Sequence, residues 1–443
     1  MHAVGGSLVM RQVGEPLRRV LIANRGEIAV RIIRACRASG VESVAVYSDA
    51  DRSAMHTRAA DHAVNIGPAR AADSYLCGER IVQAALGAGA DAVHPGYGFL
   101  SERADFATAC EAAGLVFIGP SPETLAGLGD KLAARRAAVA TGVPIVPGTL
   151  EPLLTAAPDA MAGVSAEASR IGWPLLVKAA AGGGGRGMRR VDGPEDLAPA
   201  IAAATREATA AFGDGAVFLE RFVEGGRHVE VQLLGDAHGM VVALGERDCS
   251  VQRRHQKLVE EAPAPGLTME QRQALHALAV RVATSVGLRN AATAEFLMTP
   301  EGEFFFLEVN ARLQVEHGVT ELITGIDLVS EQLSIAAGMP LSASVLAAAD
   351  RAAVQTAHAI EVRISAEDPL RDFAPLPGTL SRWREPGGTG VRVDSGVEEG
   401  TVVSAEYDPL LAKLMVVGPD RDVALERLRR ALDDFDIGGI QTT

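Results

Sequence analysis

The chain has few cysteines, no long apolar run and no excess of positive charge, and each absence excludes a class of protein. Its four cysteines, Cys36, Cys77, Cys110 and Cys249, form no C-x-x-C pair, so neither a zinc knuckle nor a disulfide framework is predicted. No apolar run is long enough to span a bilayer, and the residues before Arg18 lack the apolar core and cleavage site of a signal peptide. A net charge of -14 disfavours nucleic-acid and membrane-surface binding. We therefore expect a cytoplasmic protein with no nucleic-acid or membrane partner.

The order of strand-like and helix-like segments predicts several domains of mixed class. With 443 residues, 48% of them hydrophobic, the chain can bury roughly two to four ordinary cores. Up to Ile118, buried strands alternate with amphipathic helices, which predicts a parallel sheet covered by helices. Single helices are expected over Pro122–Thr141 and Val319–Ala337. Between them, the prolines of VPIVPG indicate a hinge into a small α/β module with a glycine run at its centre.

The second half of the chain has a different pattern. From His228 to Phe306, longer strands joined by tight turns predict a mostly antiparallel sheet with one helix near Met269–Val286. Beyond Pro340 a shorter strand-rich region follows, with IEVRIS, VRVDS and LLAKLMVV as its clearest strands. The expected fold class is therefore α/β in the first part and α+β in the rest.

The first turn between a strand and a helix lacks the G-x-G-x-x-G fingerprint of dinucleotide-binding proteins. It reads Asn24-Arg25-Gly26-Glu27, with a single glycine. Glu27 suits the helix dipole but occupies the place that a pyrophosphate would need. A structural turn is the better interpretation, and a nicotinamide-dependent dehydrogenase is disfavoured.

A glycine-rich loop and two lysines indicate a phosphate site. The loop AAAGGGGRGM follows a strand that carries Lys178, and its bare backbone N–H groups could fold over phosphates. The ordinary alternative is a flexible hairpin linker. Lys178 upstream, together with Lys131 at the start of a helix, favours the phosphate interpretation.

A second basic segment, GERDCSVQRRHQK, concentrates positive charge between two strands. Arg253 and Arg254 are consecutive, whereas His255 and Lys257 would face one side of an extended chain. A solvated basic hairpin is the usual alternative for such a run. In an acidic protein, the cluster predicts an anionic ligand or acidic neighbours.

The most specific inference concerns two apolar strands joined by TPEGE. If Glu301 and Gly302 form a two-residue loop, Glu295 lies directly opposite Glu308. Facing carboxylates repel, so both point to water or a cation lies between them. Alternation puts Asn310 and Arg312 on the same face as Glu308. Oxygen ligands of this kind suit magnesium or manganese bridged to phosphates, which we favour over an ordinary polar sheet face.

Several strings together resemble the ATP-grasp enzymes, and more closely the biotin carboxylases. They are IANRGEIAVRIIRA, VHPGYGFLSE, GGGGRGM, ERDCSVQRRHQK, EVNARLQVEH and YDPLLAK, and the resemblance runs from about Arg18 to the end. It implies an ATP-grasp fold with a Rossmann-like domain over 18–130, an ATP-grasp domain over 131–345 with a mobile lid over 149–222, and a strand-rich biotin carboxylase C-terminal domain over 346–443. It also implies that family members continue beyond the position of Thr443.

The resemblance further implies a set of site residues. ATP would be bound by Lys131, Lys178, Gly184, Gly185, Glu220, Val223, His228, Gln252, His255 and Leu297. Two magnesium or manganese ions would be bound by Glu295, Glu308 and Asn310. Bicarbonate would be bound by Lys257, Arg312, Gln314 and the backbone of Val315, with Glu316 as the general base and Arg363 stabilising the biotin enolate.

The implied reaction is the ATP- and bicarbonate-dependent carboxylation of biotin through carboxyphosphate, the first half-reaction of an acyl-CoA carboxylase. No A-M-K-M attachment sequence occurs, so biotin is expected on a separate carrier protein or on a downstream domain. A carboxyltransferase partner and a homodimer are expected from the resemblance alone. Family members commonly read HPVTE where this chain has His317-Gly318-Val319-Thr320-Glu321, which leaves the local backbone less constrained.

Two alternatives remain open. Another ATP-grasp ligase, of the carbamoyl-phosphate or amino-ligase type, would share the glycine loop and the paired carboxylates but not RRHQK or QVEH. A catalytically silent or incomplete nucleotide-binding subunit is disfavoured because every predicted catalytic side chain is present.

Overall fold

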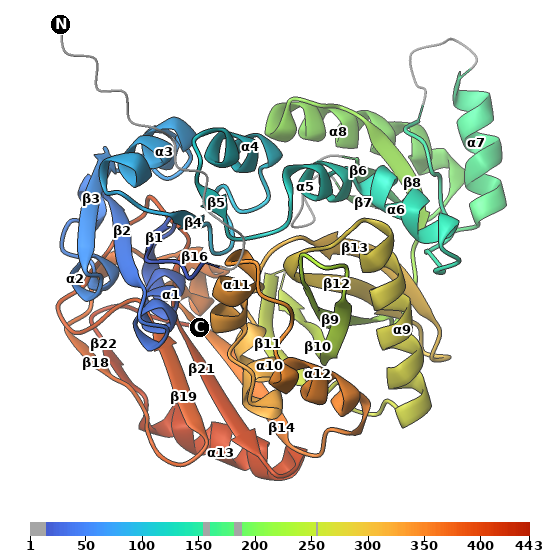
Figure 1. Cartoon of the computed structure of the whole chain (residues 1–443). Coiled ribbons are helices and arrows are strands. Elements are labelled where there is room, and N and C mark those ends of the chain that lie inside the picture. Colours follow the sequence, from blue (N-terminus) through green and yellow to red (C-terminus); the bar gives the residue numbers. More distant parts are fainter. Residues whose placement is uncertain (1–14, 154–159, 181–187, 254–255) are drawn as a thin grey trace, which may run out of the picture.

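The computed structural model describes residues 15–153, 160–180, 188–253 and 256–443. Its first part is a five-stranded parallel sheet in the order β3-β2-β1-β4-β5, with helices on its faces (Figure 1). The apolar side of α1 is buried through Ile28, Ile32 and Ile33, as the spacing of its apolar residues predicts. The predicted parallel sheet is confirmed. Its elements are β1 Arg19–Ile22, α1 Gly26–Ala38, β2 Glu42–Ser48, α2 Met55–Ala59, β3 His62–Gly67, α3 Gly78–Gly87, β4 Ala92–His94, α4 Ala104–Ala112, β5 Val116–Phe117, α5 Pro122–Gly129 and α6 Lys131–Ala140.

A small module follows, at the upper right of Figure 1. Its antiparallel sheet has the order β7-β6-β8, and two helices pack with it around a separate hydrophobic core that includes Leu175, Val177 and Leu219. The segment that enters the module makes bridges to both neighbours, because Ile145 pairs with Phe306 and Gly148 pairs with Glu220. The elements are α7 Ala160–Ile171, β6 Leu175–Ala179, β7 Arg189–Val191, α8 Pro194–Phe212 and β8 Val217–Arg221.

An eight-stranded antiparallel sheet forms the centre of the molecule, in the order β13-β12-β9-β10-β11-β14-β21-β19. Strands from the last part of the chain therefore continue the sheet that begins near Arg227. Since one hydrophobic cluster contains residues of both the first sheet and this one, the two sheets share a core. The strands are β9 Arg227–Gly235, β10 Val241–Arg253, β11 Gln256–Ala262, β12 Asn290–Met298, β13 Phe304–Asn310, β14 His358–Ser365, β19 Val391–Ser395 and β21 Leu410–Gly418.

The remaining elements cover and extend the central sheet. Helix α9 packs on β9 and β10, while α10 packs on β10, β11, β14 and β21. The helices are α9 Met269–Ser285, α10 His317–Thr324, α11 Leu328–Ala336, α12 Ala343–Asp350 and α13 Arg421–Asp434. Short strand pairs complete the last part: β15 Glu367–Asp368 with β16 Ala374–Pro375, β17 Gly378–Thr379 with β20 Val402–Val403, and β18 Arg382–Arg384 with β22 Asp436–Gly438.

Two predicted helices are each divided in the structure. The helix expected over Pro122–Thr141 breaks at Asp130, which is extended (φ -90°, ψ 108°) and accepts hydrogen bonds from the N–H groups of Leu132 and Ala133 as the cap of α6. The helix expected over Val319–Ala337 breaks at Gly325, whose φ of 74° ends α10 in the left-handed conformation. Apolar periodicity continued through both breaks, so only the capping residues signal them.

Within the described part of the chain, every helix is too short or too polar to cross a membrane.

Candidate active site

The strands β12 and β13 confirm the predicted pairing of Glu295 with Glu308. The loop differs from the predicted two-residue turn, because Thr299 N–H donates to the Glu303 carbonyl and three residues lie between them. An irregularity between the Glu295 and Phe296 pairs shifts the register by one residue and restores the predicted partners. The longer loop and the irregularity shift the pairing by one residue in opposite directions, so the two carboxylates still face each other.

The row of facing carboxylates is longer than predicted. On its other edge, β12 pairs with β9, which places Glu230 opposite Glu295, and β9 in turn pairs Glu230 with Arg247 of β10. Like charges on neighbouring strands destabilise a sheet unless cations lie among them. Positively charged side chains are therefore required next to this row of carboxylates.

A cavity of about 680 Å³ lies over this face of the sheet. Residues from the first βα turn, from the small module and from the last strands also contribute to its walls. Of the predicted site residues, the lining includes Lys131, Lys178, Glu220, His228, Gln252, Lys257, Glu295, Glu308, Asn310, Arg312, Gln314, Val315 and Arg363. Sequence segments more than 200 residues apart thus meet in one cavity.

Lys257 is the centre of the buried charge cluster. Its Nζ donates to Glu230 Oε2 at 2.5 Å, to Glu316 Oε1 at 2.6 Å and to Glu295 Oε1 at 3.2 Å. Burial alone would lower the pKa of Lys257, but these three carboxylates raise it well above its usual value. The acidic neighbours that the basic segment requires are therefore present, and the ammonium stays charged.

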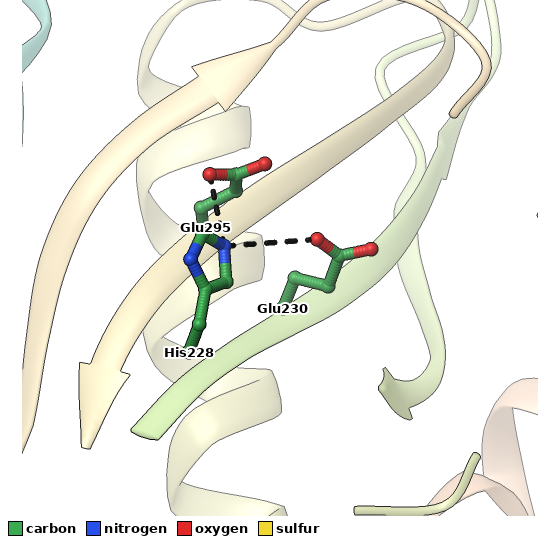
Figure 2. A group of neighbouring side chains, drawn as sticks. All are labelled: His228, Glu230 and Glu295. Carbon is green, nitrogen blue, oxygen red and sulfur yellow. Dashed lines mark ion pairs between the residues drawn. The ribbon is translucent and has the colours of Figure 1, made fainter. Parts of the chain in front are cut away.

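Figure 2 shows that the imidazole of His228 also lies beside this row, between Glu230 and Glu295. Its Nε2 lies 3.0 Å from Glu295 Oε2 and 3.9 Å from Glu230 Oε2. Burial opposes the charged form of the imidazole, but Glu295 outweighs it and raises the pKa of His228. Gln252, another predicted site residue, lies 3.3 Å from His228 Nδ1 through its Nε2.

Glu230 was missed by the sequence interpretation, and Arg247 was included only as part of the basic segment GERDCSVQRRHQK, without a role in the site. The Arg247 side chain is fully buried and donates to Glu230 Oε1 at 2.7 Å, to Gln232 Oε1 at 2.8 Å and to the hydroxyls of Thr320 and Thr293. The glutamate has no exposed side-chain surface either. A buried guanidinium with this many acceptors fixes the carboxylate that Lys257 also contacts.

Glu316 lies directly behind the cavity wall, at the start of α10, and two cations contact it. Besides the bond from Lys257, Glu316 Oε2 accepts from the Arg363 guanidinium at 3.2 Å. Burial would raise the pKa of Glu316, but Lys257 and Arg363 lower it well below its ordinary value. The carboxylate is therefore ionised at neutral pH, as a general base must be.

Arg363 is also held by Glu260, a residue that the sequence interpretation missed. Arg363 Nε donates to Glu260 Oε1 at 2.7 Å. Burial raises the pKa of Glu260 to about 7, against the opposite effect of Arg363. Arg363 therefore bridges two buried carboxylates, and one of them titrates near neutral pH.

The predicted bicarbonate residues from the loop after β13 lie together. Arg312 donates to Gln314 Oε1 at 2.9 Å and to Asn310 Oδ1 at 3.1 Å, and its Nε lies 3.0 Å from the carboxylate of Glu102. Gln314 Nε2 and Asn310 Nδ2 both donate to Glu295 Oε1, at 3.2 Å and 2.9 Å. One network thus connects the guanidinium to the row of carboxylates.

The other end of the cavity carries two lysines, each paired with one carboxylate. Lys178 Nζ donates to Glu220 Oε1 at 2.8 Å, and Lys131 Nζ lies 3.5 Å from Glu308 Oε2. Arg135, fully buried and one helical turn after Lys131, donates to Glu220 Oε2 at 2.6 Å. This end offers partly exposed ammonium groups to a ligand, as a phosphate site requires.

The donor set fits a magnesium or manganese ion. Glu295 and Glu308 are partners on adjacent strands and both line the cavity. The Glu308 side chain is 31% exposed, and within the described residues its one ion-pair partner is Lys131, at 3.5 Å. The Glu308 carboxylate therefore has the free acceptor capacity that these ions prefer, whereas Glu295 would exchange one of its four donors for the ion.

Some predicted residues are outside this assembly. Gly184, Gly185 and His255 lie outside the described residues. Val223 follows β8 and Leu297 lies on β12, and neither is among the described residues that line the cavity. Their assignment to ATP stays a prediction.

The fold and the site together define a class. A small α/β module carrying a lysine faces paired carboxylates on an antiparallel sheet across one cavity, which is the arrangement expected of an ATP-grasp enzyme. The family models agree with this class and narrow it. Residues 130–344 match the ATP-binding domain of the carbamoyl-phosphate synthase L chain, residues 16–125 match the N-terminal domain of biotin carboxylase, and residues 361–443 match its C-terminal domain.

Individual proteins give the same result. Biotin carboxylase 2 of Bacillus subtilis is 49% identical over 424 residues, which cover 96% of this chain and 93% of that protein. The mitochondrial methylcrotonoyl-CoA carboxylase subunit alpha of rice (Oryza sativa subsp. japonica) is 50% identical over 430 residues, which cover 96% of this chain but 57% of that longer protein. The chain belongs to the biotin carboxylase family.

The fold of the chain is also similar to that of a solved biotin carboxylase structure. The biotin carboxylase domain of Hydrogenobacter thermophilus 2-oxoglutarate carboxylase, a dimer in complex with MgADP, ADP and bicarbonate, superposes with a TM-score of 0.90. It is 44% identical, and the match covers 97% of this chain and 92% of that chain. The predicted ATP-grasp fold is confirmed.

Proposed function

We propose that this chain carboxylates biotin with ATP and bicarbonate, giving ADP, phosphate and carboxybiotin. The observation that carries the proposal is the contact of one buried carboxylate, Glu316, with both Lys257 and Arg363 beside a cavity that also holds Lys178. The proposed base would thus lie next to the proposed anion site, beside the cavity that carries the proposed phosphate site. The ATP-grasp ligase and silent-subunit alternatives gain no support from the relatives.

The first step joins bicarbonate to a phosphoryl group. Lys257, Arg312 and the backbone of Val315 would bind bicarbonate, and Glu316 would take its proton. A bicarbonate oxygen then attacks the γ-phosphorus of ATP, the bond to the β-phosphate oxygen breaks, and ADP leaves. Lys131 and Lys178 would neutralise charge on the phosphates. A magnesium or manganese ion held by Glu295, Glu308 and Asn310 would add electrostatic stabilisation of the transferred phosphoryl group.

The second step moves the carboxyl group to biotin. Carboxyphosphate breaks its C–O bond to give carbon dioxide and phosphate, and the phosphate takes the proton of the biotin ureido nitrogen. The nitrogen then bonds to carbon dioxide, while Arg363 would hold the enolate oxygen. Glu260 supports this role because it accepts from Nε of the guanidinium and lies 2.5 Å from Nη2, the nitrogen that also contacts Glu316.

The partners follow from the chemistry of the product. Carboxybiotin has to pass its carboxyl group on, so we propose a biotin carrier protein or domain and a carboxyltransferase as partners. The Hydrogenobacter domain is a dimer, and a homodimer is proposed here by that likeness. The cytoplasmic location and the domain boundaries given above stay predictions.

Steady-state ATP hydrolysis tests the proposal. The purified chain with ATP and magnesium is assayed without addition, with bicarbonate, and with bicarbonate plus free biotin. Turnover that depends on bicarbonate and rises with biotin is expected. ATP binding without bicarbonate-dependent turnover would contradict the proposal, and stimulation by a different carboxylate acceptor would move the chain to another ATP-grasp ligase activity.

A further inference from the structure

Lysine is rare in this chain, and where it occurs is informative. Only four of the 42 lysine and arginine residues are lysines: Lys131, Lys178, Lys257 and Lys413. Three of them line the active-site cavity. Since the chain uses arginine nearly everywhere else, a lysine indicates a place where a compact ammonium is needed and a planar guanidinium does not serve. Lys413 has no role in the proposed reaction.

Lys413 lies on β21, beneath the cavity floor, with no exposed surface. Its Nζ donates to the Val315 carbonyl at 2.8 Å, and it lies 3.3 Å from Glu27 Oε2 and 3.9 Å from Asp394 Oδ2. Burial alone would lower the pKa of Lys413, but Glu27, Glu361 and Asp394 raise it above its usual value. A charged donor therefore binds the backbone of a residue that lines the cavity.

The partners of Lys413 come from strings that the reaction leaves without a role. Glu27 belongs to the first βα turn, and Tyr97, from VHPGYGFLSE, donates its hydroxyl to Glu27 Oε1. Gly396, at the end of β19, packs so closely on this turn that an added Cβ would lie 2.4 Å from Glu27 N. The turn that was predicted to be structural therefore also contributes Glu27 as an ion-pair partner of the buried Lys413 ammonium.

We propose that Lys413 is a positioning residue for the bicarbonate subsite, acting through the Val315 carbonyl. This inference rests on the proposed function. The bond fixes the orientation of the peptide that joins Val315 to Glu316. It therefore constrains the backbone of Val315, whose N–H in the preceding peptide would bind the anion, and the start of the general base. Glu27 fixes the ammonium in turn, which connects the first and last parts of the chain to the chemistry.

Two measurements on Lys413→Met test the proposal, because methionine keeps the length of the side chain and removes the charge and the donor. The first is the KM for bicarbonate in ATP hydrolysis beside the Kd for ATP. The second is amide hydrogen exchange of the segment 313–317 in the ligand-free chain. The matched control is Arg392→Met, which removes a cation that donates to Asp394 and Glu321 and, within the described residues, not to Val315.

We expect Lys413→Met to raise the bicarbonate KM and the exchange rate of segment 313–317 roughly tenfold or more, as the loss of a charged hydrogen bond requires. The ATP Kd should not change, and Arg392→Met should leave the bicarbonate KM and the exchange rate of segment 313–317 unchanged.

If Lys413→Met fails to fold, Glu27→Gln is measured instead. It should raise the bicarbonate KM and the exchange rate of segment 313–317 by a smaller factor. Equal behaviour of Lys413→Met and Arg392→Met would overturn the proposal. If the unmodified chain shows no bicarbonate-dependent turnover, the proposed function fails, and hydrogen exchange alone still decides the positioning role.

Discussion

The two ends of the cavity hold charge in different ways. At the end that we propose binds phosphate, called the phosphate end, Lys178 and Lys131 each pair with one carboxylate and remain partly exposed. At the end that we propose for carboxylation, called the carboxylation end, Lys257 contacts three carboxylates, and Glu230 and Glu316 have no exposed side-chain surface. At the first end, each ammonium group can leave its single carboxylate partner and bind a ligand. At the second end, the charged groups form a buried network in which each is fixed by several ion pairs. Substitutions should therefore affect binding at one end and turnover, stability or pH dependence at the other.

The largest expected effect is on turnover, from Glu316→Gln. The amide keeps the shape of the side chain but cannot take a proton, so bicarbonate-dependent kcat should fall by about 10²–10⁴-fold. The ATP Kd, measured by titration, should stay as it is, because the ion-pair partners of Glu316 are Lys257 and Arg363, whereas Lys178 pairs with Glu220. Lys178→Met is the corresponding variant at the phosphate end, and it should weaken ATP binding. A loss of ATP affinity in Glu316→Gln would break the distinction between the two ends.

Stability should be most sensitive at Arg247, which is buried beneath the carboxylation end. Arg247→Met removes a partner of Glu230 and leaves buried polar groups unmatched, which should lower the free energy of unfolding by about 3–5 kcal/mol. Urea unfolding measures this. Arg190→Met is the control, because Arg190 pairs with Asp192 and Glu224 on the exposed surface of the small module and should change stability little. Similar midpoints for the two variants would contradict the account of Arg247.

The carboxylation end should also cause the biotin-dependent rate to fall at low pH, which is the acid limb of the pH–rate profile. Burial raises the pKa of Glu260 to about 7, so Glu260 is charged above that pH and neutral below it. If charged Glu260 orients Arg363, the biotin-dependent rate rises with pH through about 7 and falls as the pH drops. In Glu260→Gln the rate should be lower at pH 8, and this limb should disappear. An unchanged limb in the variant would assign it to another group.

The smallest effect tests the packing behind the general base. At Gly318, an added Cβ would lie 2.2 Å from Met415 Sδ, so the methionine fills the space that a side chain would need. Gly318→Ala should therefore cost about 1–3 kcal/mol of stability. The cost should shrink in the Met415→Ala background, which a double-mutant cycle measures. Additive effects would show that the two positions are not coupled.

Local patterns predicted the parts of the site that are close in sequence. Glu295 and Glu308 lie on one hairpin, so their pairing could be inferred, although the inference survived only because a three-residue loop and a register shift cancel. The alternation of strands and helices likewise predicted the parallel sheet. The breaks at Asp130 and Gly325 were missed because apolar periodicity continues through them.

The rest of the carboxylation end could not be predicted from local patterns. Glu230 joins the row because β9 pairs with β12, and Glu260 meets Arg363 because β11 pairs with β14. These pairings join strands far apart in sequence, and nothing in a single strand specifies its distant neighbour. In the same way, the last strands read as a separate region, yet β14, β21 and β19 complete the central sheet.

The most direct test of the account is transfer of labelled carbon. The chain is incubated with ATP, magnesium, free biotin and ¹⁴C-bicarbonate, and acid-labile carboxybiotin is separated and counted. We predict label in biotin that requires ATP and is lost in Glu316→Gln, with ADP formed in at least equal amount. ATP hydrolysis stimulated by bicarbonate with no label in biotin would contradict it.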